Sequence, residues 1–390
     1  MPTEELITRP NQLAACCDHI AARHVFGFDT EFIGEETFVP ELCLVQVATP
    51  ERLFVIDPLS VGPLEQFWKL VTNSAHTAVV HAGREEIRLC HRQSGSLPAK
   101  LFDLQIAAGL VGYTYPIGHG PLIQQALNVR LHKHETLTNW RQRPLSPQQL
   151  EYAFDDVRYL LPLWEKLSAK LTKLGRNDWL REETDLLLQR SLGQDPSVER
   201  WRKLKGAGSL DRKRLAILRA LYTWREDKAT QRNRPVRTVV RDDLLVEIAR
   251  RNPKQEADLE VMRGLAKRDV PEIMALLNQV RGCPADEFPA LAPREDDPPE
   301  MAWIVAVLHA VLCDWCQRNV LSPALAASNH ELKTLIRSLA RNESLPANSP
   351  FAKGWRKQVL LPELLPLLQG RRGLRIKSLE GNSPFEVRDL

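Results

Sequence analysis

The first 110 residues contain four short runs of apolar, β-branched and aromatic residues, with polar segments between them. Such runs predict buried strands, and the segments PLEQFWKLVTN and GREEIRLCHRQ have the apolar spacing of helices. Short connections between the first three runs suit antiparallel pairing. We therefore expect an α/β domain in which helices pack on the faces of a mixed sheet. The four runs are HVFGFDTEF, LCLVQVAT, RLFVIDP and HTAVVHA.

Beyond residue 145 the pattern is helical almost throughout, and strand signals become weak after residue 190. SLGQDPSVER indicates a boundary, and a later segment with five prolines and a cluster of acids has the composition of a linker. The expected order is an α/β domain at 1–195, a helical domain at 200–281, the linker at 282–300, a second helical domain at 301–370 and a loosely ordered tail at 371–390.

The two expected helical domains share a loose layout. LYTWREDKA at 221–229 resembles VLCDWCQRN at 311–319, and each is followed by a polar segment and then by an apolar helical pattern. RDDLLVEIARRNP and NHELKTLIRSLARN could be the equivalent next helices. The similarity predicts two divergent copies of one small helical domain.

Composition narrows the class of protein. No apolar run approaches the roughly 20 residues that span a bilayer, and MPTEELITRP lacks a signal-peptide pattern, so we expect a cytoplasmic protein without a membrane partner. The seven cysteines are odd in number and scattered, which favours reduced thiols. CDWC at 313–316 has no second Cys or His pair to complete a zinc site, so it predicts a buried helical pair.

The formal net charge is only +4, but its distribution is uneven. Residues 200–281 contain 21 Lys and Arg against 11 Asp and Glu, a surplus of ten, so the remaining chain must have a net charge of about minus six. A basic module joined to an acidic one suggests that one part holds a polyanion and the other acts on it. A solvated helical face would also produce some of this excess.

Two acids interrupt the otherwise apolar strand pattern VFGFDTEFIG at 25–34. Asp29 and Glu31 are two residues apart, so on a strand both point to the same face of the sheet. Burying two like charges there is costly unless a cation or another partner lies between them. The alternative is a strand end or turn that reaches water.

A helix is predicted to begin at Ser146, because Pro147 and Gln149 complete a capping-box signature. Tyr152 and Asp156 are four residues apart on this helix and share a face. A hydroxyl and a carboxylate are therefore expected side by side; the alternative is a surface pair beside Asp155.

The segment HAGREEIRLC supplies a further acid. At 100° per residue, Glu86 lies at the edge of the apolar arc, whereas Glu85 falls on the opposite side near Arg88. Asp29, Glu31, Glu86 and Asp156 thus come from one strand and two helices. Converging carboxylates suit hard divalent cations such as Mg²⁺, and two such ions roughly 4 Å apart can activate water and stabilise the leaving oxygen of a phosphodiester.

Taken together, DTEF, HAGxEx, FDLQIAA at 102–108 and WRQRPLSPQQLEYAFDDVRYLLPL resemble the DEDD 3′–5′ exonucleases. The closest resemblance is to the ribonuclease D family, in the subgroup with a Tyr-x-x-x-Asp motif, and it covers the whole chain. It implies an RNase H-like catalytic domain followed by two helical domains of the helicase-and-RNase-D C-terminal (HRDC) type. It also implies 3′–5′ exoribonuclease activity on precursors such as tRNA, with release of 5′-mononucleotides.

By this resemblance Asp29, Glu31 and Asp156 are metal ligands for two Mg²⁺ or Mn²⁺ ions, Glu86 takes the fourth acidic position, and Tyr152 orients the attacking water. We interpret Asp103 as structural and His81 as a hydrogen-bonded histidine at a strand end.

The family pattern has Asp where this chain has Glu86. The extra methylene displaces the carboxylate, and a misplacement of about 1 Å can cost on the order of 10²-fold in rate. The substitution predicts reduced activity or a preference for the more permissive Mn²⁺. Two alternative functions stay open: a DNA-directed 3′–5′ exonuclease, and a nucleic-acid-binding protein with a weakened site. No GxxxxGK[ST] segment is present, which argues against a fused helicase motor.

The segment HKHETLTNWRQRP, before the last motif, combines basic residues with an indole. Lys133, Trp140, Arg141 and Arg143 would suit phosphate contacts and base stacking on single-stranded RNA, and we predict Lys133, Trp140 and Arg143 as substrate-binding residues. The alternative is that Trp140 packs under the helix start and leaves the arginines exposed. WRKLKG at 201–206 and DRKRL at 211–215 would hold the nucleic acid away from the active site, and no protein partner can be inferred.

Overall fold

The computed structural model describes residues 2–34, 37–131, 139–192, 199–291, 297–379 and 384–390. These residues form two compact units. The first contains the described parts of 1–31, 43–194 and 297–390, and the second those of 32–42 and 195–296.

A six-stranded mixed sheet lies at the centre of the N-terminal part, as the sequence predicted, in the order β1-β4-β3-β2-β5-β6. Strands β3 and β4 pair antiparallel, whereas β1 is parallel to β4 and β5 is parallel to both β2 and β6. The two edge strands were not predicted, because β1 (TEELI) is mostly polar and β6 has only three residues. The strands are β1 (Thr3–Ile7), β2 (Val25–Ile33), β3 (Glu41–Ala48), β4 (Arg52–Ile56), β5 (Thr77–Val80) and β6 (Leu101–Asp103).

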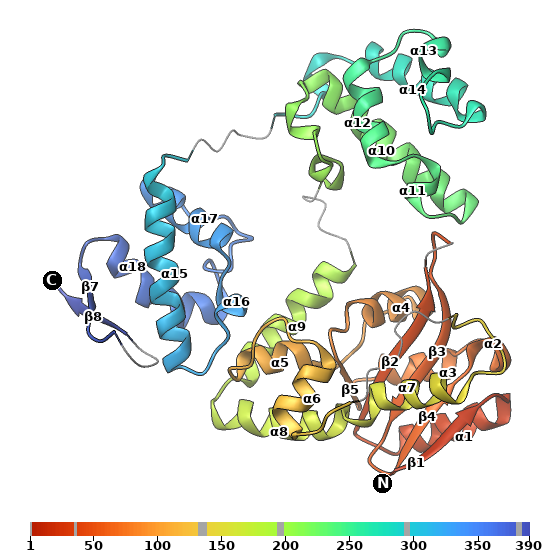
Figure 1. The fold of residues 1–390 in the computed structure, drawn as a ribbon, viewed down its shortest axis with the longest axis vertical. Helices are drawn as coiled ribbons and strands as arrows, with labels where there is room; N and C mark the ends of the chain where they lie inside the picture. Colours follow the sequence, from red (N-terminus) through yellow and green to blue (C-terminus); the bar gives the residue numbers. More distant parts are fainter. Residues whose placement is uncertain (1, 35–36, 132–138, 193–198, 292–296, 380–383) are drawn as a thin grey trace. The chain divides into compact units, whose positions relative to one another are not determined.

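Helices cover both faces of this sheet (Figure 1). On one face Phe26 and Phe28 of β2 pack against Phe67 of α3, with ring centroids 6.2 and 5.7 Å apart. The helices of this part are α1 (Pro10–Ala21), α2 (Pro58–Val61), α3 (Glu65–Val71), α4 (Arg84–Ser94), α5 (Leu104–Leu110), α6 (His119–Leu127), α7 (Pro147–Arg158), α8 (Leu160–Lys173) and α9 (Asn177–Ser191).

Gly27 identifies the helices on the opposite face. A Cβ atom at this position would lie 2.9 Å from the Cβ of Leu160, at the start of α8, so only glycine allows this close approach. Side chains alternate along a strand, so Asp29 and Glu31 share the face of Gly27, and Thr30 shares the face of Phe26 and Phe28. The two strand acids therefore point toward the layer that contains α7 and α8.

Helix α7 begins with the predicted capping box. The hydroxyl of Ser146 accepts from the Gln149 amide at 3.1 Å, and the Ser146 amide donates to Gln149 Oε1 at 2.9 Å. Pro147 occupies the first turn, where its missing N–H costs nothing. This cap fixes where the helix starts, and with it the positions of Tyr152 and Asp156.

The C-terminal part of the first unit is helical and ends in a small sheet. The tail was expected to be loosely ordered, and this expectation is wrong: β7 and β8 pair antiparallel, with Leu374 opposite Val387. Half-buried apolar residues on both strands explain the pairing. The elements are α15 (Glu300–Arg318), α16 (Pro323–Ala326), α17 (Asn329–Ala340), a π-helical turn (Arg356–Leu360), α18 (Leu361–Leu368), β7 (Arg372–Ile376) and β8 (Phe385–Asp389).

Buried polar contacts join this C-terminal part to α9 and α5. Glu183 of α9 accepts hydrogen bonds from the guanidinium of Arg356 and, at 2.8 Å, from the indole of Trp355. Trp179 stacks on Trp355 with ring centroids 4.5 Å apart. Arg176, just before α9, donates to the carbonyl of Val320 at 2.8 Å and to that of Leu110, at the end of α5, at 2.6 Å. Because Glu183 and Arg356 are both buried, their pairing links the two parts into one unit.

The second unit is a bundle around one apolar core, in which α10 packs on α12 and α14. Its α10–α12 pair and the α15–α17 pair occupy the positions predicted from sequence, although a second HRDC-like domain stays a prediction. Part of the expected linker, 292–296, lies outside the described residues. The elements are α10 (Arg212–Arg232), α11 (Val236–Val239), α12 (Asp242–Arg251), α13 (Glu256–Glu260), α14 (Val270–Gly282) and 3₁₀ turns at Arg200–Lys203, Ala207–Ser209, Lys267–Asp269 and Ala285–Glu287.

In the described part of the chain, no helix is both long and apolar enough to cross a membrane. All seven cysteines are described, and none of them forms a disulfide. Cys316 is fully buried on α15, as predicted for CDWC, and Cys313 is half-buried with its Sγ 3.6 Å from His309 Nδ1.

Candidate active site

The four acids predicted from the sequence gather where β2 extends past its neighbour. The pairing of β2 with β5 reaches Gly27, opposite Val79, and β5 ends one residue later. Helix α4 follows β5, and its first turn places the buried Glu86 beside the part of β2 that extends beyond its pairing with β5. The proximity is electrostatically significant, because the charge of Glu86 raises the pKa values of both Asp29 and Glu31.

Helix α7 brings the remaining two groups from the facing layer. The hydroxyl of Tyr152 donates a hydrogen bond to the carboxylate of Asp156, one helical turn away. Burial and the charges of Asp156 and Glu31 raise the pKa of Tyr152, so its hydroxyl keeps its proton throughout the physiological range. Asp155, in contrast, is ion-paired to Arg158 at 2.8 Å. The alternative of a surface pair beside Asp155 therefore does not describe Tyr152 and Asp156.

Burial and mutual repulsion make these acids hard to ionise together. Burial raises the pKa of Glu86 to about 7, and burial plus the charge of Glu86 raises the pKa of Glu31 to about 7. Burial and the charge of Glu31 raise the pKa of Asp156 to about 8. Burial, followed by the charges of Glu86 and Asp156, also raises the pKa of Asp29 well above its ordinary value. A cation among these acids would favour their ionised forms and lower their pKa values.

Thr30, which the sequence analysis overlooked, contacts two of the four acids. Its backbone amide donates to Asp29 Oδ1 at 2.8 Å, and its hydroxyl donates to Glu86 Oε1 at 2.7 Å. Its position between the two strand acids was the available signal. The contact to α4 joins residues 56 apart in sequence, which no local pattern reports.

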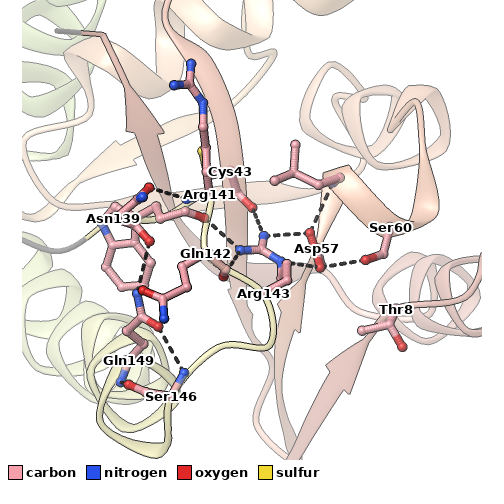
Figure 2. Close-up of polar contacts among 12 residues, drawn as sticks. Thr8, Cys43, Asp57, Ser60, Asn139, Arg141, Gln142, Arg143, Ser146 and Gln149 are labelled. Atoms are coloured by element: carbon pink, nitrogen blue, oxygen red, sulfur yellow. Dashed lines mark hydrogen bonds and ion pairs between the residues drawn. The ribbon is translucent and has the colours of Figure 1, made fainter. Parts of the chain in front are cut away.

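Trp140 and Arg143 are anchored within the protein, as Figure 2 shows for Arg143. Trp140 is 6% exposed, lies 5.8 Å from the ring of Tyr152, and hydrogen-bonds through its indole to Glu31. Arg143 donates from Nε and Nη2 to both oxygens of Asp57, each at 2.7 Å. Its other N–H groups reach the carbonyls of Trp140 and Gln142, at 2.7 and 2.8 Å, and of Cys43, at 3.1 Å.

These contacts correct the substrate-binding prediction for two of its three residues. All five N–H donors of Arg143 are engaged, which leaves none for a phosphate, and Trp140 is too buried to stack on a base. The packed alternative holds for Trp140, but Arg143 is anchored rather than exposed. Lys133 lies outside the described residues.

Asp57 is the buried partner that makes this anchor effective. It is 1% exposed, caps α2 by accepting from the Leu59 amide at 3.1 Å, and accepts from the hydroxyl of Ser60 at 2.7 Å. Although burial raises its pKa, the hydrogen bonds from Arg143 and Ser60 hold it below the ordinary value. The ion pair thereby ties the segment before α7, which includes Trp140, to the end of β4.

The donor set fits a hard divalent cation, because it consists of carboxylates, one buried (Glu86) and three half-buried, whose pKa values are raised. No three Asp, Glu, His or Cys side chains among the described residues are arranged as a ready-made metal centre. To hold one cation together, three or more of these carboxylates would have to move closer to one another.

Two family models match the chain: 3′–5′ exonuclease at residues 5–172 and HRDC domain at 214–277. Over 97% of its length the chain is 33% identical to ribonuclease D of Acidiphilium cryptum, covering 98% of that protein. The chain belongs to the ribonuclease D family. Ribonuclease D of Bartonella henselae is 32% identical, over 96% of this chain and 92% of that protein.

The crystal structure of Escherichia coli RNase D has the same architecture, with a TM-score of 0.83, 28% identity, and coverage of 95% of this chain and 99% of that one. The predicted fold class, a mixed sheet flanked by helices and followed by an HRDC domain and a helical C-terminal part, is thus confirmed. Membership in the ribonuclease D family makes the chain a 3′–5′ exoribonuclease.

Within this ribonuclease D fold, three further residues behave as the sequence analysis expected. Glu85 is partly exposed and ion-paired to Arg88. Asp103 caps α5 at the Gln105 amide (2.8 Å) and also accepts from the Gly83 amide at 2.9 Å, which fixes the start of α4. His81 is satisfied by the Ile117 carbonyl, 3.0 Å from its Nε2.

Proposed function

We propose that this exoribonuclease uses two divalent metal ions, Mg²⁺ or Mn²⁺, held by Asp29, Glu31, Glu86 and Asp156, to release 5′-mononucleotides from the 3′ end of RNA. The observation that supports this proposal is the gathering of four carboxylates from β2, α4 and α7, each with a raised pKa. Four ionised carboxylates this close together destabilise the fold, because each charge is partly desolvated and repels the others. A structural role alone therefore does not account for the cluster.

When bound, two ions supply an activated water and stabilise the leaving oxygen of the phosphodiester. The side chains of the chain determine where these events occur. Asp29 and Glu31 project from a rigid strand, and Glu31 is held by the indole of Trp140. Tyr152 keeps its proton beside Asp156, so its hydroxyl is placed to orient the attacking water by hydrogen bonding.

For the substrate we propose structured RNA, with the maturation of tRNA 3′ ends as the specific role. The E. coli relative is described as an exoribonuclease involved in structured RNA processing. The basic segment 200–281, which contains the HRDC match at 214–277, supports the same choice, since its excess of ten positive charges suits phosphate contacts away from the active site. A cytoplasmic location stays a prediction from the sequence.

The test is an exonuclease assay with 5′-labelled RNA that has a 3′ extension, and with single-stranded DNA for comparison. Each substrate is incubated with Mg²⁺, with Mn²⁺ and with chelator, and the products are resolved at nucleotide resolution. We expect stepwise shortening and free 5′-mononucleotides with metal, no reaction with chelator, and faster turnover of RNA than of DNA. Equal or faster turnover of DNA would refute the proposed substrate, and turnover in chelator would refute the metal mechanism.

Matched variants separate the chemistry from folding. Asp29→Asn keeps the side-chain shape and should abolish turnover while leaving RNA binding nearly intact. Glu85→Gln, a change one residue from Glu86 but directed at the surface pair with Arg88, should leave turnover unchanged. Loss of RNA binding and of folding together in Asp29→Asn would contradict a metal-ligand role.

A further inference from the structure

Thr30 of the candidate site contacts one carboxylate on its own strand, β2, and one on α4. Thr30 donates from its amide to Asp29 and from its hydroxyl to Glu86 Oε1, at 2.8 and 2.7 Å. It is 6% exposed and Glu86 is equally buried, so water does not compete for the hydroxyl contact.

The side chain of Thr30 approaches Glu86 from the opposite face to the strand acids. Alternation along β2 places it with Phe26 and Phe28, whose rings pack against Phe67. Thr30 therefore lies on the apolar face of β2, where it is 6% exposed, and its β-branched side chain has little rotamer freedom. The hydroxyl is a fixed donor to one of the two carboxylate oxygens of Glu86.

A glutamate at this position needs such a donor more than an aspartate would. The extra carbon–carbon bond, about 1.5 Å long, adds a rotatable torsion, and Mg²⁺ tolerates little distortion of its ligands. The same extra length lets the carboxylate of Glu86 reach Thr30. An aspartate, with its carboxylate drawn back by about that length, would lose the 2.7 Å contact.

We infer that Thr30 is a positioning residue, which holds the carboxylate of Glu86 where it can serve the metal site and so adapts the site to a glutamate at the fourth acidic position. This inference rests on the proposed two-metal function. It assigns the two residues a joint role, so that the effect of losing one depends on the presence of the other.

The experiment measures Mn²⁺ affinity of the full-length protein by titration calorimetry and by electron paramagnetic resonance of free Mn²⁺. Removing a partner that orients a metal ligand typically weakens metal binding by about 10- to 100-fold, and we expect a loss in this range for Thr30→Val. Thr30→Ser, which keeps the hydroxyl, should stay within about threefold of the original affinity, well inside that loss.

Thr184→Val is the matched control, because Thr184 is equally buried on α9 and its hydroxyl has no hydrogen-bond partner among the described residues. Its Mn²⁺ affinity should be unchanged. If Thr30→Val does not fold, Thr30→Ala, which cannot overpack the site, provides the same comparison. Unchanged affinity in the folded Thr30 variant would overturn the inference.

A double-mutant cycle distinguishes positioning from a general structural effect. In a Glu86→Asp background, Thr30→Val should change Mn²⁺ affinity by less than about threefold, because the hydrogen bond is already absent. An equal loss in both backgrounds would overturn the joint role. Asp29→Asn tests the underlying function separately: if it binds Mn²⁺ normally, the metal site itself is wrong, whatever Thr30 does.

Discussion

Metal binding at neutral pH should release protons from the acidic cluster. Without metal, burial and mutual repulsion raise the pKa values of Glu31 and Glu86 to about 7 and that of Asp156 to about 8. Ligation requires the carboxylate forms, so a cation must displace whatever protons the three groups still hold. The perturbation is the addition of Mn²⁺ to chelator-treated protein at a series of pH values.

The expected number follows from these pKa values. At pH 7 the two glutamates are each about half protonated and Asp156 is about nine-tenths protonated, which gives release of about two protons per chain. At pH 9 the three groups together retain only about a tenth of a proton. Burial and the charges of Glu86 and Asp156 also raise the pKa of Asp29, so the count from the other three acids does not include any proton that Asp29 contributes.

The assay is calorimetric titration with Mn²⁺ in two buffers that differ in ionisation enthalpy, repeated at pH 7 and pH 9. The difference in apparent binding enthalpy gives the number of protons released. Asp29→Asn, which should not bind the metal, corrects for buffer effects. Release of less than about half a proton at pH 7 would refute the reasoning, because it would mean that the acids are ionised without a cation.

Three further predictions concern the scaffold and the basic module. Arg143→Met leaves the buried Asp57 without its partner, so the free energy of unfolding in urea should fall by about 3 kcal/mol, and an unchanged midpoint would refute the anchoring role. Arg356→Met strands the buried Glu183, and we expect a loss of about 3–5 kcal/mol in the same measurement; a loss below about 1 kcal/mol would show that the contact is not buried in solution. Replacing three exposed lysines of the basic module by Gln should weaken RNA binding in gel-shift titrations and make its logarithmic salt dependence shallower by about 2, since each phosphate contact on a single strand contributes about 0.7; an unchanged slope would exclude them from the interface. These lysines are Lys203, Lys205 and Lys213.

Patterns that depend on local geometry predicted much of the catalytic part. The capping box at Ser146 set the start of α7, and helical spacing then placed Tyr152 beside Asp156. The apolar arc of α4 correctly separated the buried Glu86 from the ion-paired Glu85. In each case a few neighbouring residues contain the whole physical argument.

Contacts between distant segments were not predictable in this way. Arg143 lies in a basic segment that suits phosphate binding. Its five donors, however, are engaged by Asp57, which is 86 residues away, by the carbonyl of Cys43, which is 100 residues away, and by two carbonyls of its own segment. Trp140 is buried, and its indole hydrogen-bonds to Glu31 of β2, which is also far away in the sequence. The strands at the C-terminus were missed because short, half-polar strands depend on their partner for stability more than on their own pattern.

The location of bound metal tests the central claim most directly. Crystals of the full-length protein soaked in Mn²⁺ would be measured at a wavelength where manganese scatters anomalously. We predict two anomalous peaks roughly 4 Å apart, within ligand distance of Asp29, Glu31, Glu86 and Asp156. Peaks elsewhere, or no peak among these carboxylates under conditions in which the enzyme is active, would contradict the account.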